Sequence, residues 1–331
     1  MSYTLVAIDV GASRTRVRVG GDPTEFHGRG DPLIRDIRSG TELTRLLSEV
    51  REDLAVSGPV HLSAGLAAPP LGEGVREMTN WPRDRQITVD GLRALGFDEV
   101  TLLNDLEAAA HGLTAFLENE PSDSHLVPFG DVTVPEAGNR ALVIPGSGLG
   151  SAGIIDLGIE SPSRWHIVAS EAGHTLASGH DEDELLQRLE VLRGSPPTWE
   201  DCCSGPGLEA LWVATEPDHD DDPLSAPEIA MRAAQGDPRC QEALDHYYRF
   251  AARFAQSLAL SFLSVGGLYL AGGTTRSNAP LISEEEFLRA FHENHRMAAV
   301  LEDIPVFLVL AEINLLGAWE VGWRRIRRDV D

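Results

Sequence analysis

The N-terminal stretch 5–19 contains an apolar run, a short glycine-containing turn and a second segment in which apolar and polar residues alternate. Val17 and Val19 alternate with Arg16 and Arg18, and this period of two is typical of a half-buried strand. The same order of strand, glycine turn and strand recurs at 140–155. We therefore predict two β-hairpins, and their common design suggests that the chain contains two related halves.

Helical periodicity marks several other segments. After the capping-box sequence Ser39-Gly-Thr-Glu42, Leu43, Leu46 and Leu47 recur on one face of a helix. Apolar runs between the helices predict buried strands. The expected strands are 60–66, 100–103, 165–168, 267–271 and 304–310, and the expected helices are 39–54, 89–96, 106–113, 182–193, 208 onward, 238–263, 284–295 and 315–328. Strands that alternate with helices in this way predict an α/β fold.

The length of the chain favours two domains. A chain of 331 residues is too long for one ordinary compact domain. Residues 119–139 are rich in Pro, Gly, Asp and Glu, which is typical of a connecting segment. We place the domain hinge at the start of this segment.

Composition limits the classes of partner and the cellular location that we expect. The net charge is −25 and the pI is near 4.7, so the chain is repelled by nucleic acid and anionic lipid, and we expect neither as a partner. Asp9 lies near the N-terminus and no long uncharged apolar run follows. We therefore expect neither a signal peptide nor a transmembrane helix. Cys202, Cys203 and Cys240 lack zinc-type spacing, and their odd number argues against a disulfide framework. A reducing cytoplasm is the expected location.

Lysine is absent, so the 27 residues counted as Lys or Arg are all arginine. Two explanations stay open. Codon usage can favour arginine, or an acidic, lysine-free surface can suit a high-salt cytoplasm in which charge repulsion is screened. The absence also excludes functions, because P-loop, protein-kinase and Schiff-base chemistry all need a lysine.

One candidate site lies at Asn104 and Asp105, where the strand 100–103 ends and a helix begins. Asn and Asp are both preferred helix N-cap residues, so capping alone would explain this junction. The end of a strand also fixes a carboxylate on rigid backbone, which a catalytic group requires. The two roles are compatible, because a cap can hold the carboxylate still.

Glycine motifs form a second group of candidates. The backbone of Gly11, the hydroxyl of Ser13 and the carboxylate of Asp9 could together hold a phosphate and its magnesium, although a plain hairpin also explains them. The motif Gly146-x-Gly148-x-Gly150 is not a dinucleotide-binding fingerprint, because its spacing is wrong and a strand follows it. The pair Gly272-Gly273 predicts either a turn or the close approach of backbone to a nucleotide.

Eight short motifs follow one another along essentially the whole chain. They are Asp9-x-Gly11-Ala-Ser13-x-x-Arg16, Thr79-Asn80, Leu103-Asn-Asp105, Gly146-Ser-Gly-Leu-Gly150, Glu171-Ala-Gly-His174, Ser204-Gly-Pro-Gly207, Ala271-Gly-Gly273 and Leu315-Leu-Gly317. Each is weak alone, but their order is the order seen in bacterial glucokinases. The chain therefore resembles the hexokinase-type glucokinases of the actin-like ATPase superfamily. It lacks the cysteine-rich zinc motif of the related repressor and sugar-kinase family.

The resemblance implies a two-domain actin-like ATPase fold, which is an α/β, ribonuclease H-like fold with an interdomain cleft. A small domain would comprise 1–117 and 315–331, and a large domain 118–314. Sugar and ATP would bind in the cleft, and domain closure would exclude water. The resemblance also implies a homodimer.

The resemblance assigns roles to individual residues. Asp105 would be the general base that takes the proton from the 6-hydroxyl of glucose. The other hydroxyls would be bound by Asn80, Asn104, Glu171, His174 and Glu200. The phosphates of ATP would lie against Gly11, Ser13, Gly146, Ser147, Gly148 and Gly150. Gly272 and Gly273 would pass beside the adenosine, and Asp9 would place Mg²⁺ through water.

The first hairpin departs from the family pattern. Gly11-Ala12-Ser13 stands where the family usually carries Gly-Gly-Thr. Ser13 keeps the hydroxyl, whereas Ala12 would be strained if that position needs a positive φ. Ser147 also replaces a threonine and keeps its hydroxyl. A weaker or altered grip on the nucleotide is therefore an open alternative to the usual one.

Three functions stay open at this point. The first is an ATP-dependent glucokinase or, close to it, a kinase for another hexose or an amino sugar, because carboxylate acceptors tolerate several sugars. The second is a catalytically weak sugar sensor, although no helix-turn-helix or basic segment predicts DNA binding. The third is a polymerising or chaperone-type member of the superfamily, which would not need Glu171, His174 and Glu200.

Overall fold

The computed structural model forms two compact units. It describes residues 3–11, 14–26, 31–54, 58–69, 72, 74–119, 125–130, 132, 137–158, 164–179, 182–216 and 222–330. The first unit comprises Met1–Pro121 and Glu312–Asp331, and the second comprises Ser122–Ala311. Each unit has a sheet and a hydrophobic core of its own.

A five-stranded sheet forms the centre of the first unit. Its strands are β1 (Thr4–Val10), β2 (Arg14–Gly20), β3 (Leu33–Asp36), β4 (Val60–Leu66) and β7 (Glu99–Asn104). They lie in the order β3-β2-β1-β4-β7. β2 pairs antiparallel with both β1 and β3, whereas β1, β4 and β7 run parallel. Two short strands, β5 (Val75–Glu77) and β6 (Gln86–Thr88), form a separate antiparallel pair.

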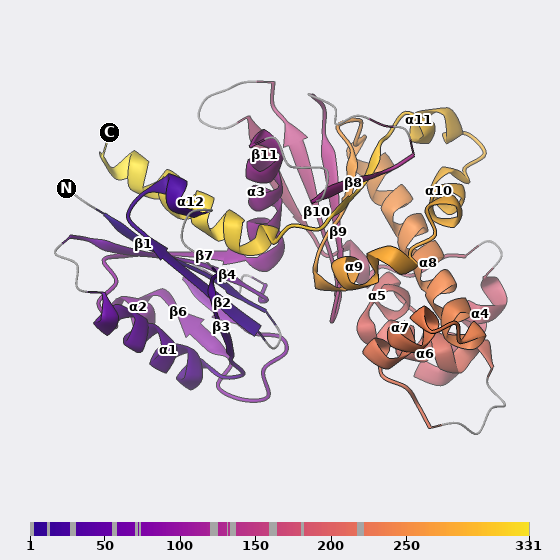
Figure 1. Cartoon of the computed structure of the whole chain (residues 1–331), viewed down its shortest axis with the longest axis horizontal. Helices are drawn as coiled ribbons and strands as arrows, with labels where there is room; N and C mark the ends of the chain where they lie inside the picture. The colour runs from indigo at the N-terminus through magenta and orange to yellow at the C-terminus, as the bar shows by residue number, and fades with distance from the viewer. Residues whose placement is uncertain are drawn as a thin grey trace. The chain divides into compact units, whose positions relative to one another are not determined.

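The alternating side chains of β1 hold helices on both faces of this sheet. The helices are α1 (Gly40–Asp53), α2 (Val89–Arg93), α3 (Asp105–Glu118) and α12 (Ile313–Val330), with the 3-10 turn η1 (Pro23–Phe26). Val6 and Ile8 share a core with α1 and α2, whereas Leu5 and Ala7 share a core with α12. α12 therefore covers the face opposite to α1 and α2 (Figure 1). The two-residue period of the strand decides which helix each side chain contacts.

α3 and α12 cross at a pair of glycines. A Cβ atom on Gly112 of α3 would overlap the backbone of Ile313, and one on Gly317 of α12 would overlap the backbone of Ala108. Neither position has room for a side chain, so the two helix backbones are in direct contact. This contact fixes the position of α3, the helix that begins at Asp105.

A six-stranded sheet forms the centre of the second unit. Its strands are β8 (Leu126–Phe129), β9 (Arg140–Pro145), β10 (Leu149–Asp156), β11 (Trp165–Ser170), β12 (Leu268–Leu270) and β13 (Val306–Val309), in the order β11-β10-β9-β12-β13-β8. The first five repeat the directions of the first sheet, with two antiparallel pairings followed by two parallel ones. The predicted likeness of 5–19 and 140–155 is therefore confirmed in the sheet topology.

Helices enclose the core of the second unit. They are α4 (Asp183–Arg193), α5 (Trp199–Cys203), α6 (Gly205–Thr215), α7 (Ala226–Ala234), α8 (Pro238–Phe262), α9 (Gly273–Asn278), α10 (Glu284–His292) and α11 (Ala298–Glu302), with the 3-10 turns η2 (Ala172–His174) and η3 (Ala279–Leu281). α8 spans 25 residues, and its buried face includes Leu244, Tyr247 and Phe254. Within the described part of the chain, none of the helices is long and apolar enough to cross a membrane.

The segment expected to connect the domains contains a strand. Within 119–139, Leu126–Phe129 form β8, which pairs antiparallel with β13 at the edge of the sheet. Pro128 is compatible with this place, because an edge strand does not need every backbone N–H group for pairing. A short strand between polar stretches does not show in the average composition of the segment, so the composition did not predict β8.

The segment before Leu208 is also helical, whereas we expected a helix only from 208 onward. It forms α5 and the first turn of α6. The hydroxyl of Thr198 accepts a hydrogen bond from the Asp201 N–H at 3.4 Å, and that of Ser204 accepts one from the Gly207 N–H at 3.1 Å. Each hydroxyl caps the start of a helix, so two caps close together in sequence divide the segment into two helices.

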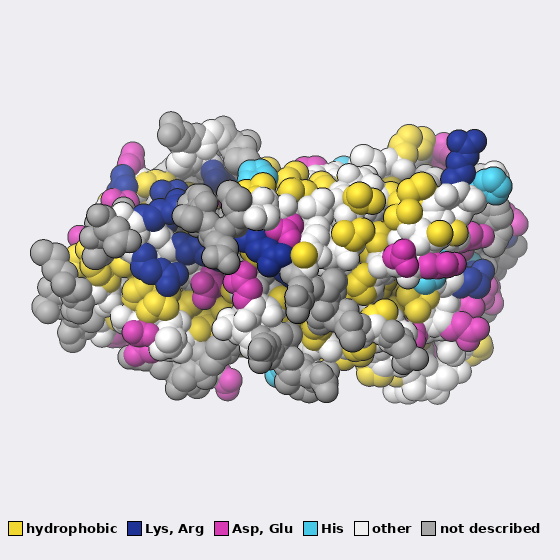
Figure 2. Space-filling view, turned by 90° about the horizontal axis from the view of Figure 1, so that it is seen from above, with side chains coloured by type: hydrophobic (Ala, Val, Ile, Leu, Met, Phe, Trp, Pro, Cys, Tyr) yellow, Lys and Arg dark blue, Asp and Glu magenta, His cyan; other side chains and the backbone are white. Residues whose placement is uncertain are grey.

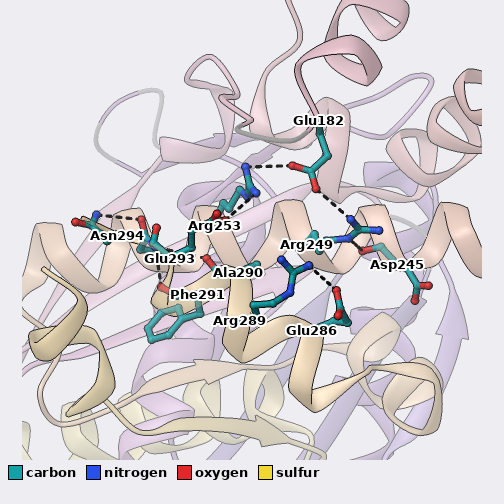
Figure 3. A network of polar contacts seen from close by, with 11 residues as sticks. Glu182, Asp245, Arg249, Arg253, Glu286, Arg289, Ala290, Phe291, Glu293 and Asn294 are labelled. Carbon is teal, nitrogen blue, oxygen red and sulfur yellow. Dashed lines mark hydrogen bonds and ion pairs between the residues drawn. The ribbon is translucent and has the colours of Figure 1, made fainter. Parts of the chain in front are cut away.

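A buried carboxylate ties the start of α4 to α8. Glu182 lies 3.5 Å from Arg249 and 3.1 Å from Arg253 (Figure 3). Arg253 also forms an ion pair with Glu293, which follows α10, at 3.1 Å. The network therefore connects α4, α8 and α10. Because removing one partner would leave a buried charge, it strongly favours this place for the start of α4.

Arginines gather on the C-terminal helix of this acidic chain. Arg324, Arg325, Arg327 and Arg328 occupy the last turns of α12, where the helix dipole favours positive charge. Figure 2 shows arginine side chains, in dark blue, gathered over the first unit. Charge balance at the helix end explains this cluster without a ligand.

Candidate functional site

Asn104, rather than Asp105, caps the helix that follows β7. The Asn104 Oδ1 accepts hydrogen bonds from the N–H groups of Leu106 (2.9 Å) and Glu107 (3.4 Å), and its Nδ2 donates to the Ala68 carbonyl at 3.3 Å. Asp105 is the first residue of α3, and its Oδ1 accepts from the Leu106 N–H at 3.0 Å. Because Asn104 does the capping, capping does not account for the aspartate that follows it.

Asp9 is a buried carboxylate near the end of β1. It is 3% exposed, and Arg16 of β2 donates from Nη1 to its Oδ2 at 2.8 Å. Arg16 Nε also lies 3.5 Å from Glu312, where the chain returns to the first unit. Burial raises the pKa of Asp9 to about 6, against the opposing effect of Arg16, and Glu312 raises it further. Asp9 therefore holds a proton more readily than an exposed aspartate.

The first hairpin closes through backbone. The Gly11 N–H donates to the Arg14 carbonyl at 3.0 Å. Ala12 and Ser13 lie outside the described residues, so the phosphate-binding hydroxyl and the strain expected there stay predictions.

The remaining candidates of the first unit share one edge of its sheet. β1, β4 and β7 run parallel, so Asp9 near the end of β1 and Asp105 just after β7 lie at the same edge. Just past β4, the Ala67 carbonyl accepts a hydrogen bond from the Thr79 hydroxyl at 3.2 Å. This contact brings the turn with the exposed Asn80 to the same edge.

The second hairpin turn is braced from the neighbouring helix. The Gly146 N–H donates to the Gly148 carbonyl at 2.8 Å, and the Gly205 N–H donates to the Gly146 carbonyl at 2.8 Å. Ser147 lies exposed in the turn. The Ser204-Gly-Pro-Gly207 motif therefore begins α6 and also supports the turn.

Glu200 joins this turn to the predicted sugar acceptors. Its Oε2 accepts a hydrogen bond from the Leu149 N–H at 2.8 Å, and its Oε1 lies 3.9 Å from His174 Nδ1. His174 Nε2 lies 3.7 Å from Glu171 Oε2. The side chains of Glu171, His174 and Glu200 are 75%, 61% and 33% exposed, so a ligand can reach them. The structure thus brings three predicted acceptors together beside the second hairpin.

Gly272 and Gly273 lie beside the same hairpin. They follow β12, which runs parallel to β9, and Gly150 lies in β10 on the other side of β9. Gly272 has a φ of 96°, which favours glycine, and a Cβ there would lie 2.7 Å from the Ile144 side chain. The glycine motifs of this unit therefore meet at one end of its sheet.

The sequence did not reveal the contacts that assemble these groups. A Cβ on Gly173, between Glu171 and His174, would stand 2.5 Å from the Leu149 carbonyl oxygen. The glycine was visible in the motif, but its partner strand was not. Arg16 was part of a motif without an assigned role, and nothing in the sequence pointed to Glu312.

The residues fit a magnesium ion that arrives with a nucleotide. Among the described residues, no group of three or more His, Cys, Asp or Glu side chains could hold a metal ion. Mg²⁺ in nucleotide sites takes one or two carboxylates, while phosphates and water supply its other ligands. Asp9, close to the Gly11 turn, is one such carboxylate.

A comparison with known proteins covers nearly the whole chain. A protein-family model described as glucokinase matches residues 5–321. The chain belongs to the glucokinase family. A glucokinase from Chromobacterium violaceum is 32% identical over 303 residues, which are 88% of this chain and 83% of that protein. A bifunctional protein glk from Burkholderia pseudomallei is 30% identical over 314 residues, 92% of this chain but only 46% of that protein. The family member described here thus spans about half the length of such bifunctional relatives.

Solved structures share the fold of this glucokinase-family chain. A glucokinase from Balamuthia mandrillaris in complex with glucose matches with a TM-score of 0.81 and 22% identity, over 97% of this chain and 94% of that chain. A ROK family glucokinase from Streptomyces griseus in complex with glucose and AMPPNP matches with a TM-score of 0.63 and 18% identity, over 97% and 99%. The predicted actin-like α/β fold class is confirmed. At these identities the likeness concerns the fold alone.

Proposed function

We propose that this chain is an ATP-dependent glucokinase that transfers the γ-phosphoryl group of ATP to the 6-hydroxyl of D-glucose. Membership of the glucokinase family supports a sugar kinase. The observation that carries the sugar site is the cluster of Glu171, His174 and Glu200 beside a glycine-rich hairpin. A structure of the same fold was solved with glucose and AMPPNP, which are ligands of the two classes proposed here.

The acceptor cluster suits the vicinal hydroxyls of a sugar. Carboxylates only accept hydrogen bonds, whereas an imidazole can both donate and accept. Asn104 uses one N–H of its amide on the Ala68 carbonyl, which leaves the second for a hydroxyl, and the exposed Asn80 adds another amide. A misplaced hydroxyl would leave some of these groups without a sugar partner and lower the affinity for an epimer, although the more exposed groups can pair with water instead.

Asp105 is the proposed general base. The 6-hydroxyl proton passes to its carboxylate while the bond from O6 to the γ-phosphorus forms and the bond to the β,γ-bridging oxygen breaks, so that ADP leaves. The first turn of α3 holds this carboxylate, and the contact between Gly112 and α12 holds the helix. A positioned base of this type contributes about 10²–10⁴-fold in rate.

The hairpin turns are the proposed phosphate sites. The N–H groups of Gly11 and Gly146 donate within the hairpins, so the other backbone N–H groups of the two turns would bind phosphate oxygens, as successive N–H groups in turns do. Gly272-Gly273 would border the adenosine. Asp9 would hold Mg²⁺ through water, and the ion neutralises charge on the β- and γ-phosphates. With a pKa of about 6, Asp9 is mostly ionised at neutral pH, and Arg16 orients it.

A coupled assay of ADP release tests this proposal. With ATP, Mg²⁺ and a panel of hexoses, we expect release that depends on glucose. Asp105→Asn should lower kcat by about 10²–10⁴-fold and leave the KM for glucose close to that of the wild type. Asp183→Asn is the matched control, because Asp183 also opens a helix, and it should keep full activity. If no sugar stimulates ADP release, the kinase proposal fails, and if Asp105→Asn stays near full activity, the assignment of the base fails.

The same panel separates the other candidates. The 75% exposure of Glu171 favours a site that tolerates several sugars, so a kinase for another hexose or an amino sugar is the second candidate. A higher kcat/KM for such a sugar than for glucose would establish it. Glucose binding in calorimetry without ADP release would instead indicate a sugar sensor.

The resemblance also supports a homodimer, and the cysteines support a reducing cytoplasm. Cys202, Cys203 and Cys240 are free and buried, which suits a reducing compartment. Sedimentation equilibrium should give twice the chain mass of 35.8 kDa. A single species of the chain mass at micromolar concentration would contradict the dimer.

A further inference from the structure

The peptide groups of Leu149 are held from both sides by segments that carry sugar acceptors. The Leu149 N–H donates to Glu200 Oε2 at 2.8 Å. Its carbonyl oxygen packs closely against Gly173, because a Cβ added to Gly173 would lie only 2.5 Å from that oxygen. Gly173 is the residue between Glu171 and His174 in η2. The first strand position after the proposed phosphate turn is therefore in contact with both parts of the acceptor cluster.

The contact with Glu200 is strong and leaves little room for movement. A hydrogen bond to an ionised carboxylate is about twice as strong as one between neutral groups. A Cβ on Gly148 would lie 2.6 Å from Glu200 Oε2, so the carboxylate also packs against the turn itself. A shift of the Glu200 carboxylate must therefore shift the backbone at 148–149.

The two oxygens of Glu200 have different partners. Oε2 accepts the hydrogen bond from the Leu149 N–H of the hairpin, whereas Oε1 lies 3.9 Å from His174 Nδ1. This distance is too long for a direct hydrogen bond and leaves Oε1 able to accept one from a sugar hydroxyl. One carboxylate can therefore contact a sugar and the phosphate turn at once.

We propose that Glu200 is a positioning residue that couples sugar binding to nucleotide binding. A sugar hydroxyl bound to Oε1 holds the carboxylate in one orientation. Because the Leu149 N–H donates to Oε2, the turn 146–148 is then also held in one conformation. Glucose should then raise the affinity for the nucleotide, and the nucleotide should raise the affinity for glucose by the same factor. The inference rests on the proposed function for the identity of the two ligands.

Glu171 provides a matched control for this role. Its carboxylate belongs to the same cluster and lies 3.7 Å from His174. Its side chain is 75% exposed, and within the part of the chain that the structure describes it forms no hydrogen bond or ion pair with the second hairpin. Replacing either glutamate by glutamine makes the same chemical change, but only Glu200 is bonded to the second hairpin.

Isothermal titration of AMPPNP in Mg²⁺, without glucose and with saturating glucose, measures the coupling factor. We expect glucose to tighten nucleotide binding in the wild type within the usual range of about 5–150-fold. Glu200→Gln should reduce that factor by about five-fold or more, because a neutral amide binds the Leu149 N–H more weakly. Glu171→Gln should weaken glucose binding but keep the factor within about two-fold of the wild type.

A second variant approaches the same contact from the hairpin. Gly148→Ala places a Cβ against Glu200 Oε2 without removing an acceptor, and it should also lower the coupling factor. It replaces Glu200→Gln as the test if circular dichroism shows that the latter does not fold.

Three results would overturn the coupling role. The first is a coupling factor of one in the wild type, and the second is a coupling factor that stays unchanged in both Glu200→Gln and Gly148→Ala. The third is a coupling factor that falls as much in Glu171→Gln as in Glu200→Gln. A direct titration with glucose separates the two proposals. If glucose binds and coupling is absent, only the inference fails, whereas if neither glucose nor another hexose binds, the proposed function fails with it.

Discussion

The two hairpins stand on sheets of the same topology but receive their carboxylates differently. In the first unit, Asp9 lies within the strand that leads into the turn and pairs with Arg16 on the strand that leaves it. In the second unit, the turn 146–148 carries no charged side chain, and Glu200 reaches it from α5. The repeated topology provides two hairpins, whereas different elements supply their charges.

This difference sets the environment of each charged group. A strand position in the middle of a sheet is covered by helices on both faces, and Asp9 is accordingly 3% exposed with a raised pKa. Glu200 stands on a short helix and its side chain is 33% exposed. A buried carboxylate can hold one fixed orientation, whereas partly exposed acceptors bind a ligand with a smaller desolvation penalty. The first arrangement is compatible with the ion proposed for Asp9, and the second with the neutral sugar proposed for Glu200.

The largest expected effect is on stability, and it compares the glycine contact between α3 and α12 in the first unit with the pair Gly272-Gly273 in the second. Gly317→Ala forces a Cβ against the backbone of Ala108, and should lower the free energy of unfolding by about 3 kcal/mol. Gly273→Ala is the control, because its Cβ would meet its nearest neighbour, Arg276, only at 4.0 Å. Urea unfolding followed by circular dichroism measures both. Equal stability of the two variants would contradict the direct contact of α3 and α12.

The second prediction concerns the burial of Asp9. Its pKa is about 6 in the folded chain against a reference value of 3.8, so the folded state binds more protons between these values. The stabilising contribution of Asp9 is complete below about pH 4 and is lost as pH rises through about 6, a change of about 3 kcal/mol. The free energy of unfolding of the wild type relative to Asp9→Asn, measured in urea with EDTA, should fall by this amount from pH 4 to 7. A constant difference would mean that the carboxyl group is not buried.

The smallest expected effect compares the helix caps of the two units. Asn104→Ala and Ser204→Ala each remove a side-chain cap and should lower the free energy of unfolding by about 1 kcal/mol. Asn104→Ala should also lower kcat, because it loosens the turn that holds Asp105. Asn104→Asp keeps an acceptor for the cap and should recover most of the stability. If Ser204→Ala lowers kcat as much as Asn104→Ala, the special link between cap and base is absent.

Much of the local structure followed from patterns along the chain. The order of strand, glycine turn and strand over 5–19 and 140–155 predicted both hairpins, and helical periodicity predicted α1, α4 and α8. The short elements β3, β8 and α5 were not predicted, because three to five residues carry too few repeats of a period to stand out. The composition of 119–139 likewise gave no sign of the four-residue strand that lies between its polar stretches.

The candidate site was less accessible from sequence than the fold. Motif order selected Glu171, His174 and Glu200, and the structure groups them beside the second hairpin. The division of roles between Asn104 and Asp105 was not readable, because both residue types cap helices. The sequence also did not predict the ion pair of Arg16 with Glu312, because Glu312 lies far along the chain and reaches Arg16 only after α12 packs on the first sheet.

The sequence by itself determined the periodic elements, the acidic and lysine-free composition that excludes several chemistries, and the order of motifs that marks the glucokinase family. These properties depend on neighbours a few residues apart, so they are present in the chain before it folds. Only the tertiary structure decided that Asp9 is buried with a raised pKa, that α3 rests on α12 through glycines, and that Glu200 bonds to Leu149. Each of these depends on segments distant in sequence, which meet when helices and strands bury their apolar faces together.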